Sequence, residues 1–192
     1  MSISLIIMVG LPVLYLTGSL RKATSAAGIG GTAFVLYFVL CAALSIVPIV
    51  TVIDKISVCV SGAFLCFAPA FFLLIQKDFT FRFYLASAIT VLLSVSASFV
   101  SISYTVTYLS AVLIFAVSLL ALLFMKSRAP LYAPVLIGIY SIAEDIMALL
   151  TETVRTVTAF DVLDIASLSL VVCLAASYLL SRPWQKEPAV QT

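Results

Sequence analysis

Between Phe83 and Met125 the chain reads FYLASAITVLLSVSASFVSISYTVTYLSAVLIFAVSLLALLFM, without a charged residue, a glycine or a proline. An α-helix rises about 1.5 Å per residue, so this stretch as one helix would be about 65 Å long. That is roughly twice the hydrocarbon core of a bilayer, which is about 30 Å thick. We therefore predict two helices that are separated by a turn at Ser101–Tyr104, the most polar place in the stretch.

The rest of the chain has the same apolar character. Of its 192 residues, 64% are hydrophobic and 9% are charged, and the mean hydropathy is +1.29. An ordinary soluble domain carries about 25% charged residues, and a fold of this size cannot hide so much apolar side chain from water. The composition excludes a soluble globular enzyme, a disordered chain and a nucleic-acid-binding protein, and it indicates that lipid surrounds most of the chain.

The net charge and the absence of histidine limit the kinds of binding and catalytic site that the chain can form. The net charge of +2 is too small to suggest binding to a phosphate backbone. The absence of histidine removes Ser–His and Cys–His nucleophile pairs, histidine metal sites and histidine proton shuttles. The cysteines stand in apolar stretches without C-x-x-C spacing, so we expect them to be small packing residues, and we expect no metal and no cofactor. These cysteines are Cys41, Cys59, Cys66 and Cys173.

Seven stretches are long enough for a membrane-crossing helix, which needs about 20 apolar residues. They are Ile3–Leu20, Gly31–Ile53, Ile56–Gln76, Phe83–Ser101, Tyr104–Met125, Pro130–Leu150 and Val157–Leu180. The predicted fold class is therefore all-α, a polytopic integral membrane bundle of seven transmembrane helices. Residues 1–182 would form one domain and residues 183–192 a short cytoplasmic tail. A six-helix chain is the alternative, because a turn at Ser101–Tyr104 would carry no charge.

The basic residues support this count and predict an orientation. Basic loops favour the cytoplasmic side of a membrane. With the N-terminus outside, the three inside loops and the C-terminal tail hold eight of the ten Lys and Arg residues. Only Lys55 and Arg155 fall outside. The inside pairs are Arg21 and Lys22, Lys77 and Arg82, Lys126 and Arg128, and Arg182 and Lys186. We expect an N-out, C-in, multi-pass protein of the plasma membrane.

Three prolines, Pro12, Pro48 and Pro69, fall inside predicted helices. A proline inside a helix removes one backbone hydrogen bond and leaves a carbonyl without its donor. In a membrane bundle, groups on neighbouring helices can satisfy such a carbonyl.

Acidic residues gather near the end of the chain. Glu144 and Asp145 fall in the sixth predicted helix, and Asp161 and Asp164 open the seventh. If these helices are antiparallel neighbours, Asp145 and Asp164 lie at about the same depth, between 7 and 8 Å below the helix ends, and can face each other. Ionisable groups inside a membrane are costly and indicate a functional site. We predict a site for a cation or a proton, with Asp164 as its best single residue.

Nearby residues could support this site. Tyr140 lies one turn before Glu144, and Ser141 one turn before Asp145, so that both could donate hydrogen bonds to the acids. The alternative is structural: the sixth helix ends near Ala143, and Glu144 through Asp161 form a solvated outer loop in which Arg155 pairs with an acid.

The run Phe160–Leu168, FDVLDIASL, resembles the seventh-helix signature of microbial (type I) rhodopsins. That signature has an aromatic residue, apolar residues, an aspartate and a small residue before the lysine that binds retinal. Seven spans with N-out, C-in topology agree with that family. The resemblance implies that Asp164 matches the counter-ion of the family's seventh helix.

The chain departs from that family at the position that matters for its chemistry. Leu168 occupies the position of the retinal lysine, so no Schiff base can form there. When the family's third-helix proline is aligned on Pro69, Phe64 stands in place of a tryptophan. Val60, Ala63 and Ala68 replace the arginine, the carboxylate and a threonine. The resemblance implies a rhodopsin-like scaffold without pigment or pump.

Three function classes follow. The first is a non-enzymatic transporter, channel or sensor-type bundle in which the acids bind a cation or a proton. The second is an intramembrane aspartic protease, with Asp145 paired with Asp161 or Asp164; the family's Gly-x-Gly-Asp and Tyr-Asp motifs are absent. The third is a non-catalytic subunit of a membrane complex. The expected partners are the lipid bilayer, a cation or proton, and a membrane-protein partner or a second copy of the chain, with no nucleic acid.

Overall fold

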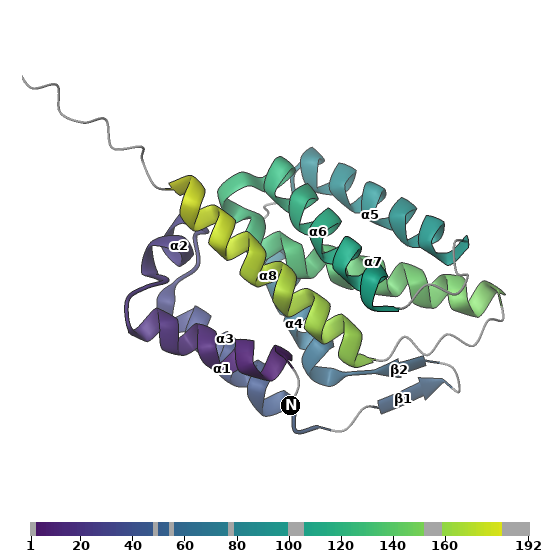
Figure 1. Ribbon diagram of the computed structural model, residues 1–192, viewed down its shortest axis with the longest axis horizontal. Helices are drawn as coiled ribbons and strands as arrows, with labels where there is room; N and C mark the ends of the chain where they lie inside the picture. Colours follow the sequence, from purple (N-terminus) through teal and green to yellow (C-terminus); the bar gives the residue numbers. More distant parts are fainter. Residues whose placement is uncertain are drawn as a thin grey trace, which may run out of the picture.

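The computed structural model describes residues 3–47, 50–53, 56–76, 79–99, 106–151 and 159–181 (Figure 1). Their elements are, in order, α1 (Ile3–Leu16), α2 (Arg21–Ala26), α3 (Gly31–Leu44), β1 (Val50–Ile53), β2 (Ile56–Val58), α4 (Val60–Ile75), α5 (Phe81–Phe99), α6 (Val106–Met125), the 3-10 turn η1 (Lys126–Arg128), α7 (Ala129–Thr151) and α8 (Ala159–Ser181). The prediction of an all-α fold is confirmed, apart from one small hairpin.

The charge-free stretch holds two helices within the described residues. Helix α5 ends at Phe99 and α6 begins at Val106, whereas the predicted turn at Ser101–Tyr104 lies outside the described residues. Within the described part, no helix combines the length and the apolar character that crossing a membrane requires. The prediction of transmembrane helices is therefore not confirmed by the helices themselves.

The hairpin β1–β2 corrects two predicted helix boundaries. Helix α3 ends at Leu44 rather than at Ile53, and α4 begins at Val60 rather than at Ile56. Between them the strands pair antiparallel, Val50 with Val58 and Ile53 with Ile56. Valine, isoleucine and threonine fill this segment, and their branched side chains favour strands. Apolar length alone did not distinguish such a segment from the end of a helix.

Helix α7 forms the centre of the bundle. Every residue from 129 to 138 is buried, which makes the first half of the helix buried on all sides. It packs against α4, α5, α6 and α8, and α8 in turn contacts α1, α2, α4 and α6 (Figure 1). A helix that is apolar all round needs such a complete cover. The α7–α8 pair is therefore the core around which the other helices are arranged.

Small and hydroxyl-bearing residues are buried between the helices beside large apolar ones, and many other large apolar side chains are exposed. Buried positions include the hydroxyl residues Thr90, Ser94, Ser118, Ser167, Ser169 and Ser177 and the alanines Ala86, Ala121, Ala133 and Ala166. Large apolar side chains are exposed on every long helix, among them Ile6, Leu36, Phe71, Leu92, Phe115, Ile146 and Leu179. Some buried hydroxyls bond to their own helix, as Thr90 Oγ1 does to the Ala86 carbonyl at 2.9 Å.

All four cysteines are buried and free, which confirms their role as packing residues. Cys66 lies at a close approach of α4 to α7. A Cβ atom added at Gly138 would lie 2.9 Å from the Cβ of Cys66. The glycine therefore lets the two helix backbones come together at this point.

Pro69 shows how the bundle satisfies a backbone carbonyl. It lies inside α4, so the carbonyl of Leu65, four residues earlier, loses its helical donor. The hydroxyl of Tyr37, on α3, donates a hydrogen bond to that same carbonyl. This confirms, for Pro69, the expectation that a neighbouring helix supplies the missing donor. This hydrogen bond attaches α3 to the part of α4 that contains Pro69.

A double-mutant cycle tests this arrangement. We expect Tyr37→Phe to lower the free energy of unfolding by about 1 kcal/mol, because the Leu65 carbonyl loses its partner in an apolar interior. In a Pro69→Ala background the backbone N–H at position 69 returns, so the same substitution should cost much less. Unfolding titrations of the four proteins measure the coupling. Tyr84→Phe, which removes an exposed hydroxyl, is the control, and equal costs in both backgrounds would contradict the interpretation.

Candidate functional site

The structure places all four predicted acids on the central helix pair. Helix α7 continues to Thr151, so Glu144 and Asp145 are helical and half-buried. The alternative in which this helix ends near Ala143 is wrong. Asp164 lies between one and two turns after the start of α8 and is also half-buried.

Asp164 has a specific backbone partner. The amide of Ser4 donates a hydrogen bond of 3.0 Å to Oδ1 of Asp164. Ser4 is buried and lies in the first turn of α1, where the backbone N–H groups have no partner within the helix. A carboxylate at this place satisfies one such group and interacts favourably with the positive end of the helix dipole. Asp164 therefore acts as a cap for α1 that is supplied by another helix.

The residues expected to support the acids lie in different surroundings. Tyr140 is buried, and its carbonyl accepts a hydrogen bond of 3.3 Å from Ser94 Oγ, which links α5 to α7 just before the acids. Ser141 is half-buried. The side chain of Asp161 and the whole of Arg155 lie outside the described residues. The expected partnership between Arg155 and the acids stays a prediction.

Metal binding by the acids has no support in the described residues. Among these residues, no three or more Cys, Asp or Glu side chains are grouped so that they could hold a metal ion. Glu144, Asp145 and Asp164 are thus not assembled into a metal centre. What the geometry offers is a pair of half-buried acids on α7 and a capping carboxylate on α8.

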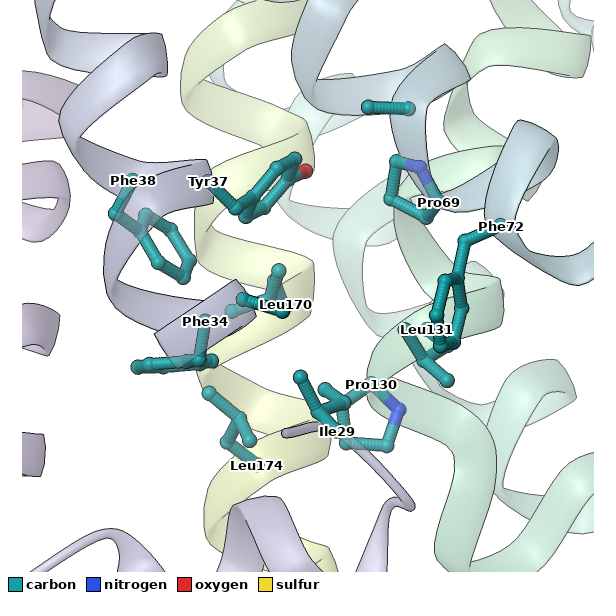
Figure 2. Close-up of a pocket in the computed structure, with 12 residues that line it drawn as sticks. Ile29, Phe34, Tyr37, Phe38, Pro69, Phe72, Pro130, Leu131, Leu170 and Leu174 are labelled. Carbon is teal, nitrogen blue, oxygen red and sulfur yellow. The ribbon is translucent and has the colours of Figure 1, made fainter. Parts of the chain in front are cut away.

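An apolar cavity of about 190 Å³ is the feature that reasoning from the sequence missed. Figure 2 shows aromatic side chains of α3 facing Pro69 and Phe72 of α4 and Pro130 and Leu131 of α7, with Leu170 and Leu174 of α8 between them. The complete lining is Ile29, Ala33, Phe34, Tyr37, Phe38, Ala68, Pro69, Phe72, Pro130, Leu131, Leu170 and Leu174. Apart from Ile29, which precedes α3, these residues come from four helices, so no local pattern could have indicated the cavity.

Comparison of the chain with protein-family models, curated proteins and solved structures found no match. The resemblance to microbial rhodopsins therefore stays a prediction that rests on the residues around Asp164 and Leu168.

Two substitutions at Asp164 separate the capping role from a role of its charge. Asparagine is as good a helix cap as aspartate, whereas alanine is not. We expect Asp164→Ala to lower the free energy of unfolding by about 1 kcal/mol, and Asp164→Asn to keep most of the stability because its side-chain oxygen still accepts from the Ser4 amide. Unfolding titrations of the purified proteins measure both. If Asp164→Asn is as unstable as Asp164→Ala, the negative charge rather than the hydrogen bond stabilises this junction.

Proposed function

We propose that this chain is an integral membrane protein: a polytopic, non-enzymatic bundle of the transporter, channel or sensor type. The observation that carries the proposal is the large number of big apolar side chains on the outer surface, together with small and hydroxyl-bearing residues at buried positions between the helices. Phe115, for example, is 69% exposed on α6, whereas Ser118, one turn later, is 1% exposed. In membranes, small residues let helices approach closely, and hydroxyls bond between helices instead of facing lipid.

The outer surface supports the proposal more directly than the individual helices do. No described helix by itself meets the requirement for crossing a membrane, so the argument does not rest on helix length. It rests on the apolar side chains that are exposed along α1, α3, α4, α5 and α6. Contiguous apolar surface larger than a few hundred Å² is rare on soluble monomers and indicates contact with lipid or protein.

The charges support the proposed orientation. Basic residues of the described part lie in three elements: α2, the start of α5 and η1. Both α2 and η1 contact α8, and the ring of Phe83 on α5 lies 5.6 Å from that of Tyr132 on α7. Figure 1 shows α2 beside the yellow end of α8. One end of the bundle thus carries Arg21, Lys22, Arg82, Lys126 and Arg128, and basic ends face the cytoplasm.

Within this proposal the acids of α7 and α8 bind a cation or a proton. Asp145 is the foremost candidate among the described acids, because an oxygen of Asp164 is already engaged with α1; Glu144 lies beside Asp145 on α7. The same engagement speaks against an aspartic protease in which Asp164 shares a water with Asp145; the side chain of the other predicted partner, Asp161, lies outside the described residues. A rhodopsin-like scaffold without retinal and a subunit of a membrane complex are both compatible with the apolar outer surface.

Cysteine labelling tests location and orientation together. The native cysteines are all buried, so an added exposed cysteine reacts over a low background. We expect Ile46→Cys, at a position that is 85% exposed beyond α3, to react with a membrane-impermeant maleimide on intact cells. Ser25→Cys, on exposed α2, should react only after permeabilisation. Recovery of the protein in the soluble fraction would refute the membrane assignment, and the opposite labelling pattern would refute the orientation.

Ion flux into liposomes that contain the purified protein tests the acid site. We expect Asp145→Asn to lower cation or proton flux about tenfold or more, which corresponds to a loss of roughly 1.4 kcal/mol in ion-binding free energy. Asp164→Asn keeps the cap of α1, so a similar loss there would report on the charge alone. Ile46→Cys and protein-free liposomes are the controls. No flux through the unmodified protein would remove transport and leave a sensor-type bundle, a rhodopsin-like scaffold or a subunit of a membrane complex.

A further inference from the structure

We propose that the cavity between α3, α4, α7 and α8 holds one hydrocarbon chain of a membrane lipid. This inference rests on the proposed membrane location, because the chain would enter from the bilayer. An apolar cavity of about 150 Å³ stays dry and takes up small apolar molecules, and this one measures about 190 Å³. Pockets for whole drug-sized ligands are about 300–1,000 Å³. The size therefore fits a chain segment and not an entire lipid.

The lining offers almost nothing to a polar ligand. Tyr37 is the one polar side chain among the lining residues, and its hydroxyl already donates to the Leu65 carbonyl. Two further lining residues, Pro69 and Pro130, have no backbone N–H to donate. A polar headgroup would lose its hydrogen bonds to water here without replacement, whereas a hydrocarbon chain has none to lose.

The lining residues differ in burial, which separates an open side of the cavity, its mouth, from a buried side, its floor. At the mouth, Ala33 on α3 is exposed and Ala68 on α4 is half-buried, whereas Leu170 and Leu174 on α8 form a buried floor. The close-up in Figure 2 shows these two leucines between the side chains of α3 and those of α4 and α7.

The surface around the mouth is itself apolar. Leu36 follows Ala33 by three residues on α3, and Phe71 follows Ala68 by three on α4, so each lies on the same helical face as its partner. Both are well exposed, at 58% and 65%. The apolar cavity thus continues into the apolar outer surface between α3 and α4. In a bilayer, that surface would be in contact with acyl chains, which makes them the occupant that can reach the floor.

Photolabelling in vesicles tests the inference. The full-length protein is reconstituted in phosphatidylcholine vesicles that contain a phosphatidylcholine with a diazirine on its acyl chain, irradiated, digested and mapped by mass spectrometry. We expect label on the outer residues Leu36 and Phe71 and also on Leu170 and Leu174, which lipid can reach only through the cavity. Ala68→Phe, which places a large ring at the mouth, should lower floor labelling about tenfold without changing outer labelling.

Two further variants keep the test decisive. Ala33→Phe also places a large ring at the mouth. Because Ala33 is exposed, this variant can replace Ala68→Phe in the test if Ala68→Phe fails to fold. Ala88→Phe, at an exposed position on α5, is the matched control and should leave floor labelling unchanged. Outer labelling without floor labelling would overturn the hydrocarbon site and leave the membrane assignment intact. Absence of label from every helix would overturn both.

Discussion

Complete burial of the first half of α7 is the constraint on which the rest of the bundle depends. Ten consecutive buried residues need neighbours in every direction, and α4, α5, α6 and α8 provide them. Gly138 permits the close approach of α4, with Cys66 directly against it. Because interiors of this density tolerate few voids, the cavity beside Pro130 and Leu131 stands out as a place where the packing stays open.

Two hydrogen bonds attach outer helices to this core. In each of them a backbone group that has no partner in its own helix bonds to a side chain of another helix. The Leu65 carbonyl, which lost its donor to Pro69, accepts the hydroxyl of Tyr37, and the Ser4 amide at the start of α1 donates to Asp164. Unsatisfied backbone groups away from water cost several kcal/mol. Each contact therefore fixes the place of one helix, α3 in the first case and α1 in the second.

Asp164 illustrates how a tertiary contact changes the interpretation of a residue. An aspartate in an apolar helix indicates a functional site when its surroundings are unknown. The structure gives the same carboxylate a structural partner, whereas Glu144 and Asp145 lie half-buried on α7. The apolar cavity between α3, α4, α7 and α8 is a separate feature whose lining contains no acid.

The amino-acid sequence by itself determined the helical character, the approximate extent of the long helices and the acids on α7 and α8, because length, apolar content and charge position are local properties. It did not separate Val50–Val58 from a helix, since branched apolar residues suit both states until the neighbouring chain is known. Only the tertiary structure decided that Asp164 caps α1, that Tyr37 satisfies Leu65 and that four helices enclose a cavity. Each of these depends on which distant helix ends and faces meet, and that is set by packing around α7 rather than by any single stretch.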